Sequence, residues 1–142
     1  MILNSAARLV VNLRFSHDRI TPICIDLHFL PIRARIEFKT LLLTFKAIKY
    51  GQPSYLFDLI NWYEPEANVQ LRSSGRLNEP FISRSMNSER CFEYHAPRLF
   101  NMLPADVKSQ NSVVGFKQKL KTHIFQKAYN LSEKSVNSSY NV

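Results

Sequence analysis

A chain of 142 residues with 45% hydrophobic and 21% charged residues suits one globular domain with a real core, which excludes wholesale disorder. Two distant cysteines exclude a disulfide framework, and no apolar run approaches bilayer length, so we expect an intracellular protein, in the nucleus or cytoplasm, without secretion signal or membrane contact. The net charge of +8 is carried by both ends: residues 1–50 have eight Lys and Arg against three acids, and residues 101–142 have six against two.

The sequence pattern in the first half of the chain predicts helices. Apolar residues at helical spacing indicate a helix over residues 3–13, and Thr21 with Pro22 suits the start of a short helix that ends near His28. Pro31 opens the longest helix, which runs to about residue 49 and stops at Gly51.

This longest helix has apolar residues around much of its circumference, which is typical of a central helix contacted on several sides. We expect its main buried stripe to be formed by Ile36, Leu43 and Ala47. Leu43 should therefore lie in the core, and Lys46 on the polar side.

The second half is more varied. Ser54 suits the cap of a short helix over residues 55–62, and residues 64–74 are typical of a loop. Residues 81–86 and 90–94 alternate as two short strands would, although an irregular pair of loops fits them as well. A small helix should begin at Ala96 and Pro97. The last helix follows a cap at Asn111 or Ser112, and its buried stripe consists of Val113, Phe116, Leu120, Ile124 and Ala128.

The fold class that follows is mainly α: a small helical domain with a central long helix and a possible short β-hairpin. We expect the domain to cover residues 1–129 and residues 130–142, rich in Asn and Ser, to form a disordered polar tail.

The titratable residues do not predict an enzyme. A nucleotidyl-transferring polymerase needs paired carboxylates to hold two metal ions, and the four aspartates are scattered. Cys91 and His95 could share a helix face, but a zinc site needs four ligands and a Cys-x-x-Cys start is missing. His28, between apolar neighbours, is more typical of a hydrogen bond to a backbone carbonyl. We expect no cofactor, no metal site and no catalytic residue.

Two basic clusters remain as candidates for binding a polyanion. Arg33, Arg35, Lys39, Lys46 and Lys49 lie on the longest helix, where all but Arg33 share roughly one side. Lys117, Lys121 and Lys127 lie on the last helix. Such residues could follow a phosphate backbone, or they could simply be a solvated face opposite the core. Most aromatic residues occupy core positions; Tyr50, Trp62 and Tyr63 are the exceptions that could stack on bases.

Three stretches of the chain carry recognisable motifs. One is the Asn-Ser-Ala-Ala-Arg-Leu stretch at residues 4–9. Another is Leu-His-Phe-Leu-Pro at residues 27–31, followed by a basic helix and Pro-Ser-Tyr-Leu at residues 53–56. The third is Glu-Arg-Cys-Phe at residues 89–92, with Ala-Pro-Arg-Leu-Phe-Asn-Met-Leu-Pro at residues 96–104 and a closing helix containing Phe116, Lys117 and residues 120–125.

In their order and spacing these motifs resemble the C-terminal region of polyproteins from non-LTR (LINE-type, CR1/L2/Rex-like) retrotransposons, over about residues 3–128. Phe29 and Phe100 stand where that family usually has tryptophan. The resemblance implies a non-catalytic piece downstream of a reverse transcriptase, whose polymerase and endonuclease cores lie outside this chain.

As implied partners, the resemblance names the RNA or DNA backbone and the reverse transcriptase core of the parent element. The expected role is electrostatic holding of RNA or DNA for that polymerase. Two alternatives stay open: an interaction or scaffold module that packs on the polymerase or another partner, and a decayed copy without function.

Overall fold

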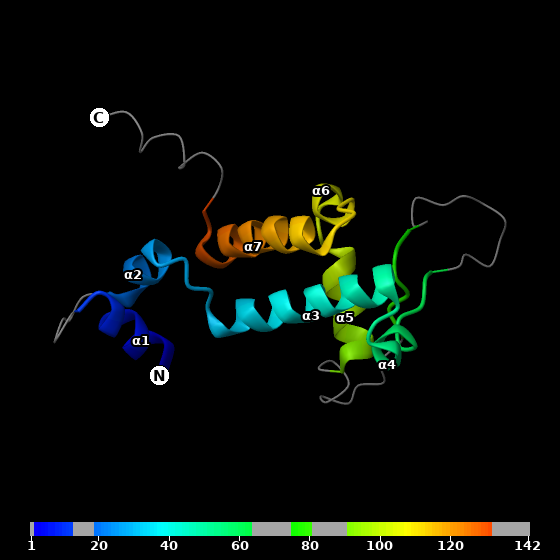
Figure 1. The fold of residues 1–142 in the computed structure, drawn as a ribbon, viewed down its shortest axis with the longest axis horizontal. Helices are drawn as coiled ribbons and strands as arrows, with labels where there is room; N and C mark the ends of the chain where they lie inside the picture. Colours follow the sequence, from blue (N-terminus) through cyan, green and yellow to red (C-terminus); the bar gives the residue numbers. More distant parts are fainter. Residues whose placement is uncertain (1, 13–18, 64–74, 81–90, 132–142) are drawn as a thin grey trace. The chain divides into compact units, whose positions relative to one another are not determined.

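The computed structural model describes residues 2–12, 19–63, 75–80 and 91–131 (Figure 1). This part of the chain is mainly helical and contains a long helix, which confirms the predicted fold class. Its helices are α1 (Ile2–Val10), α2 (Ile20–Asp26), α3 (Ile32–Tyr50), α4 (Ser54–Phe57), α5 (Phe92–Asn101), α6 (Ala105–Lys108) and α7 (Val113–Tyr129).

The chain divides into two compact units. The terminal unit consists of Met1–Arg35 and Thr122–Val142, and the central unit consists of Ile36–Lys121. Helices α3 and α7 each pass from one unit into the other.

The long helix α3 begins and ends where the sequence predicts. The carbonyl of Pro31 accepts the first helical hydrogen bond, from the amide of Arg35 at 2.9 Å. At the other end Gly51 adopts φ +64° and donates its amide to the carbonyl of Ala47. A left-handed residue after the last turn is the common helix stop, and glycine adopts it without a steric cost.

The face that α3 buries differs from the prediction. Leu41 is 2% exposed, and Thr44, Phe45 and Ala47 are also buried, whereas Leu43 is 39% exposed. Of the predicted stripe, Ala47 is confirmed, whereas the predicted burial of Leu43 and of Ile36, which is 55% exposed, is wrong. The helix has apolar residues on opposite sides, so periodicity alone fits two orientations.

A threonine helps to explain the orientation that occurs. Thr44 is fully buried although it is polar, and its hydroxyl donates to the carbonyl of Thr40 at 2.8 Å. This bond back to the preceding turn satisfies the hydroxyl, so the Thr44 side of the helix can enter the core. The predicted buried face, which consisted of apolar residues alone, did not include Thr44.

The core of the central unit joins α3 to the first half of α7. The rings of Phe45 and Phe116 stack with their centroids 4.0 Å apart. Leu120 and Phe100 are buried in the same unit. The predicted stripe of α7 is confirmed by Phe116, Leu120 and Ile124, with Val113 and Ala128 half-buried at its ends.

The predicted cap of α7 is also confirmed. The hydroxyl of Ser112 accepts a hydrogen bond from the amide of Gly115 at 3.1 Å. A hydroxyl at this position satisfies one of the amides that the first helical turn leaves without a partner. At the other end Asn130 adopts φ 52°, which closes the helix. Residues 132–142 of the predicted tail lie outside the described residues.

The region of the expected hairpin is different. Residues 81–90 lie outside the described residues, and Phe92 and Tyr94 belong to α5 rather than to a strand. Helix α5 therefore begins before Ala96 and Pro97, which were expected to open it. The amide of His95 donates to the carbonyl of Cys91, so a complete helical turn forms ahead of Pro97. Pro97 has no amide hydrogen, so it removes one hydrogen bond from the helix.

Extended backbone occurs where the sequence predicted the end of a helix over residues 55–62. Helix α4 instead follows Pro53, without a side-chain cap from Ser54, and ends at Phe57. Trp62 and Leu77 form an antiparallel bridge. The amide of Tyr63 donates to the carbonyl of Arg76, and the amide of Asn78 donates to the carbonyl of Asn61. Residues 61–63 and 76–78 thus form a short two-stranded ribbon in the central unit.

Candidate functional site

The motif at residues 96–104 contributes core residues and hydrogen bonds to the central unit. Ala96, Pro97, Phe100 and Leu103 are buried. The side chain of Asn101 clamps the extended segment at Leu77: its amide donates to the Leu77 carbonyl and its oxygen accepts from the Leu77 amide, both at 2.9 Å.

A lysine completes this cluster. Lys108 of α6 donates to the carbonyl of Asn101 at 2.8 Å, and its ammonium lies 5.8 Å from the ring centre of Phe100. Burial, and then the nearby Arg76, lower the pKa of Lys108. The contacts of this motif are internal, so its role is to hold the fold.

The motif at residues 27–31 does the same for the terminal unit. His28 adopts φ 52°, and its ring stacks on Phe125 with centroids 5.3 Å apart. Its Nδ1 lies 3.2 Å from the carbonyl oxygen of Asp26, which confirms the predicted backbone contact. The carbonyl of Phe29 accepts a hydrogen bond from the hydroxyl of Tyr129. Leu30 is buried.

Because the motif residues are occupied in these contacts, exposed side chains are the better candidates for binding. Lys39, Lys46 and Lys49, here called the basic face, are all exposed on α3. At about 100° per residue they fall within roughly 80° of one another, and at 1.5 Å per residue they span about 15 Å along the axis. The only bond of Lys49 to another described side chain is a long one, 3.4 Å to the Asn111 oxygen.

The two arginines predicted for this cluster are placed differently. The Nε of Arg35 donates to the carbonyl of Leu30 at 2.9 Å, and its guanidinium lies 6.0 Å from the ring centre of Phe29. Arg35 therefore helps to fix the start of α3 and belongs to the terminal unit. Arg33 is exposed, but it lies on another side of the helix from the basic face.

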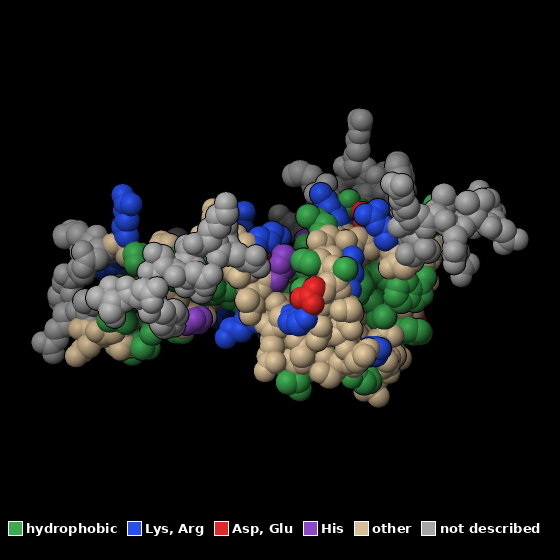
Figure 2. All heavy atoms as spheres, turned by 90° about the horizontal axis from the view of Figure 1, so that it is seen from above, with side chains coloured by type: hydrophobic (Ala, Val, Ile, Leu, Met, Phe, Trp, Pro, Cys, Tyr) green, Lys and Arg blue, Asp and Glu red, His purple; other side chains and the backbone are tan. Residues whose placement is uncertain are grey.

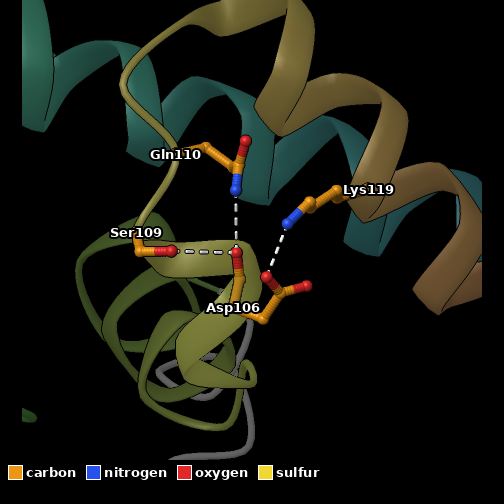
Figure 3. Close-up of polar contacts among 4 residues, drawn as sticks. All are labelled: Asp106, Ser109, Gln110 and Lys119. Atoms are coloured by element: carbon orange, nitrogen blue, oxygen red, sulfur yellow. Dashed lines mark hydrogen bonds and ion pairs between the residues drawn. The ribbon is translucent and has the colours of Figure 1, made fainter.

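On α7 the structure separates the lysines. Lys117 and Lys121 are exposed and share a side of the helix in the central unit. Between them, Lys119 forms an ion pair with Asp106, whose backbone carbonyl also accepts bonds from Ser109 and Gln110 (Figure 3). Lys127 is exposed but belongs to the terminal unit.

The two helices that carry these basic residues contain few acids. Helix α3 contains five Lys and Arg and one acid, Glu37, and α7 contains four Lys and no acid. The face drawn in Figure 2 likewise shows several blue Lys and Arg side chains and few red acidic ones. A surface of this kind attracts polyanions over distances of about a Debye length.

A second feature of the central unit is an open hollow of about 720 Å³. The described residues that line it are the apolar or aromatic Phe57, Ile60, Trp62 and Tyr63 and the polar Asp58, Asn61 and Asn78. The sequence indicated Trp62 and Tyr63 as exposed aromatics, and both are, at 50% and 42%. Asp58, Asn61 and Asn78 were missed, because no sequence pattern shows that the ribbon brings residue 78 to residues 57–63.

Among the described residues, no three or more His, Cys, Asp or Glu side chains gather as they would around a metal ion. Cys24 is buried and Cys91 is exposed, and neither forms a disulfide. None of the helices in the described ranges is long and apolar enough to cross a bilayer.

Comparison with family models, with curated proteins and with solved structures gives no match. The resemblance to LINE-type polyproteins therefore depends on the sequence motifs alone.

Proposed function

We propose that this chain binds the phosphate backbone of RNA or DNA through the basic face of α3, without reading sequence. Lys117 and Lys121 of α7 extend the contact. In this proposal the chain is the non-catalytic C-terminal part of a LINE-type retrotransposon polyprotein, works inside the cell, and holds nucleic acid for the polymerase of the parent element.

The observation that carries the proposal is the exposure of Lys39, Lys46 and Lys49 on one side of a well-formed helix. Consecutive phosphates of one DNA strand advance about 3.4 Å along the axis, so a row of lysines about 15 Å long spans roughly four of them, and each of the three lysines can meet one. Each lysine that neutralises a phosphate releases a counterion, which favours binding at low salt.

The absence of base specificity follows from the chemistry of these side chains. A lysine ammonium is a flexible point charge with three donors, and it suits phosphate oxygens better than a fixed pattern on a base edge. Contacts to phosphate position a protein on nucleic acid but carry no sequence information.

A second candidate is a scaffold module that packs on a polymerase or another protein. Exposed apolar side chains of α3 favour it: Ile36, Leu43 and Tyr50 lie on a side of the helix next to the basic face. Such a stripe suits a partner helix. On this hypothesis the lysines border a protein interface.

Fluorescence anisotropy with labelled RNA and duplex DNA of unrelated sequences separates the two candidates. The backbone-binding proposal predicts similar affinities for all sequences and a logarithm of affinity that falls linearly with the logarithm of salt concentration. Absence of binding at low salt in a folded protein would refute it and favour the scaffold. The Lys119→Ala variant is the matched control, because Asp106 already pairs with that lysine.

A further inference from the structure

The hollow beside the ribbon has the composition of a site for a flat, neutral ligand. Among the described residues, three aromatic side chains, the aliphatic Ile60 and three polar side chains line it, and none of these is Lys or Arg. Among these described lining residues, a phosphate would meet the carboxylate of Asp58 and no cation. The charged part of a polyanion is thus disfavoured inside the hollow, whereas an uncharged aromatic ring is not.

The volume of the hollow and its aromatic residues also suit a flat, neutral ligand. Small-molecule sites commonly enclose about 300–1,000 Å³ and combine aromatic walls with a few polar groups. Every nucleobase has a π-face that can stack on Tyr or Trp, so stacking does not depend on the sequence of the nucleic acid. Trp62 and Tyr63 are half-exposed although they are large and mostly apolar, so ring surface is accessible to a ligand.

The polar residues of the hollow can recognise the edge of a base. Within the described part of the chain, Asp58, Asn61 and Asn78 make no side-chain hydrogen bond. A carboxylate only accepts hydrogen bonds, so Asp58 favours a ligand that donates. Cytosine, adenine and guanine carry an exocyclic amino group that donates. Uracil and thymine donate only through the ring N3–H, which lies between two carbonyl oxygens that would repel a carboxylate.

A cation lies at the edge of the same ribbon. Arg76 pairs with Tyr63 through its backbone carbonyl and is exposed. Residues two apart in an extended segment share a face, so Arg76 lies on the same side of the ribbon as Asn78, which lines the hollow. The phosphate attached to a bound base can reach Arg76 while the base itself avoids charge.

We propose that this hollow binds an unstacked nucleobase with an exocyclic amino group, presented by single-stranded RNA or DNA. The inference rests on the proposed function and deepens it: the basic face holds the backbone of any nucleic acid, and the hollow favours single strands. A base in a duplex is already stacked and paired, so it cannot enter.

The single tryptophan of the chain makes the test direct, because Trp62 lines the hollow and its fluorescence reports on it. Short oligocytidylate and oligouridylate are titrated at high salt, where the electrostatic contribution is suppressed. We expect saturable quenching, with tighter binding of oligocytidylate. The preference should disappear in Asp58→Ala, which removes the acceptor.

Variants that keep Trp62 test the stacking. Tyr63→Ala should weaken binding of oligocytidylate roughly 5- to 100-fold, the usual range for losing one base–aromatic stack, while Tyr63→Phe should largely retain it. Tyr55→Ala is the control, since this tyrosine is 68% exposed and does not line the hollow. Circular dichroism establishes that each variant is folded.

The outcomes for the two sites are distinguishable. Quenching by oligocytidylate without any affinity for duplexes at low salt would refute the basic face and support the hollow. Salt-dependent duplex binding without quenching would refute the hollow alone. Equal binding of both oligonucleotides would overturn the assigned base class, and saturable quenching by a proline-rich peptide but by no oligonucleotide would overturn the nucleobase as ligand.

Discussion

The orientation of α3 determines both the core and the basic face, and two leucines on opposite sides of the helix test it. Leu41 is 2% exposed and Leu43 is 39% exposed. Leu41→Ala removes three buried carbon atoms and leaves a cavity, which should cost about 2–5 kcal/mol. The same truncation at Leu43 removes partly hydrated carbon atoms, so we expect at most about 1.5 kcal/mol.

Thermal unfolding followed by circular dichroism measures the contrast. For a domain of this size each 1 kcal/mol corresponds to about 4 °C, so Leu41→Ala should lower the Tm by roughly 8–20 °C and Leu43→Ala by no more than about 6 °C. The two substitutions are chemically identical, so differences in helix propensity cancel. A Leu43→Ala variant that is as destabilised as Leu41→Ala would show that α3 is rotated, and the basic face would then be misplaced.

Three further outcomes are expected. Asn101→Ala leaves the buried amide and carbonyl of Leu77 without their partner and should cost about 2–4 kcal/mol in urea unfolding, whereas the exposed Asn111→Ala should cost about 0.5 kcal/mol or less. Burial, and then the nearby Lys127, lower the pKa of His123 in the folded protein. Below about pH 6.5 the unfolded chain therefore binds a proton more readily than the folded one, and the free energy of unfolding falls. In urea unfolding, His123→Asn should reduce this fall between about pH 7 and pH 5. In primer-extension assays the chain should incorporate no nucleotide with Mg²⁺ or Mn²⁺, and activity abolished by Asp58→Asn with Asp106→Asn would contradict this.

Much of the fold could be predicted because its signals are local. Pro31 and Gly51 delimit α3, and Ser112 caps α7, since each acts through the backbone of its own turn. The buried stripe of α7 could also be predicted. The opposite side of this helix is polar, so only one orientation buries its apolar residues.

What could not be predicted depends on contacts between distant residues. The two apolar sides of α3 are distinguished by Phe116 stacking on Phe45 and by the satisfied hydroxyl of Thr44. Likewise, the bridge of Trp62 with Leu77 depends on the clamp from Asn101, which lies 24 residues after Leu77. Without that bridge the sequence gives no reason to place Asn78 beside Trp62, so the hollow could not be foreseen.

The lysines of the candidate site were predictable as residues but not as a surface. Sequence spacing put Arg35, Lys39, Lys46 and Lys49 on one side of a helix. The structure shows that Arg35 is bonded to the Leu30 carbonyl, which no spacing rule reveals. Lys39, Lys46 and Lys49 remain exposed and define the smaller face on which the proposed function depends.

The most direct test of that function is the salt dependence of duplex DNA binding by the variant in which Lys39, Lys46 and Lys49 are all alanine. If each lysine meets one phosphate, the slope of log affinity against log salt should become shallower by up to about 2.7 units, while the control Lys119→Ala leaves it nearly unchanged. An unchanged slope in the folded triple variant would contradict binding through the basic face.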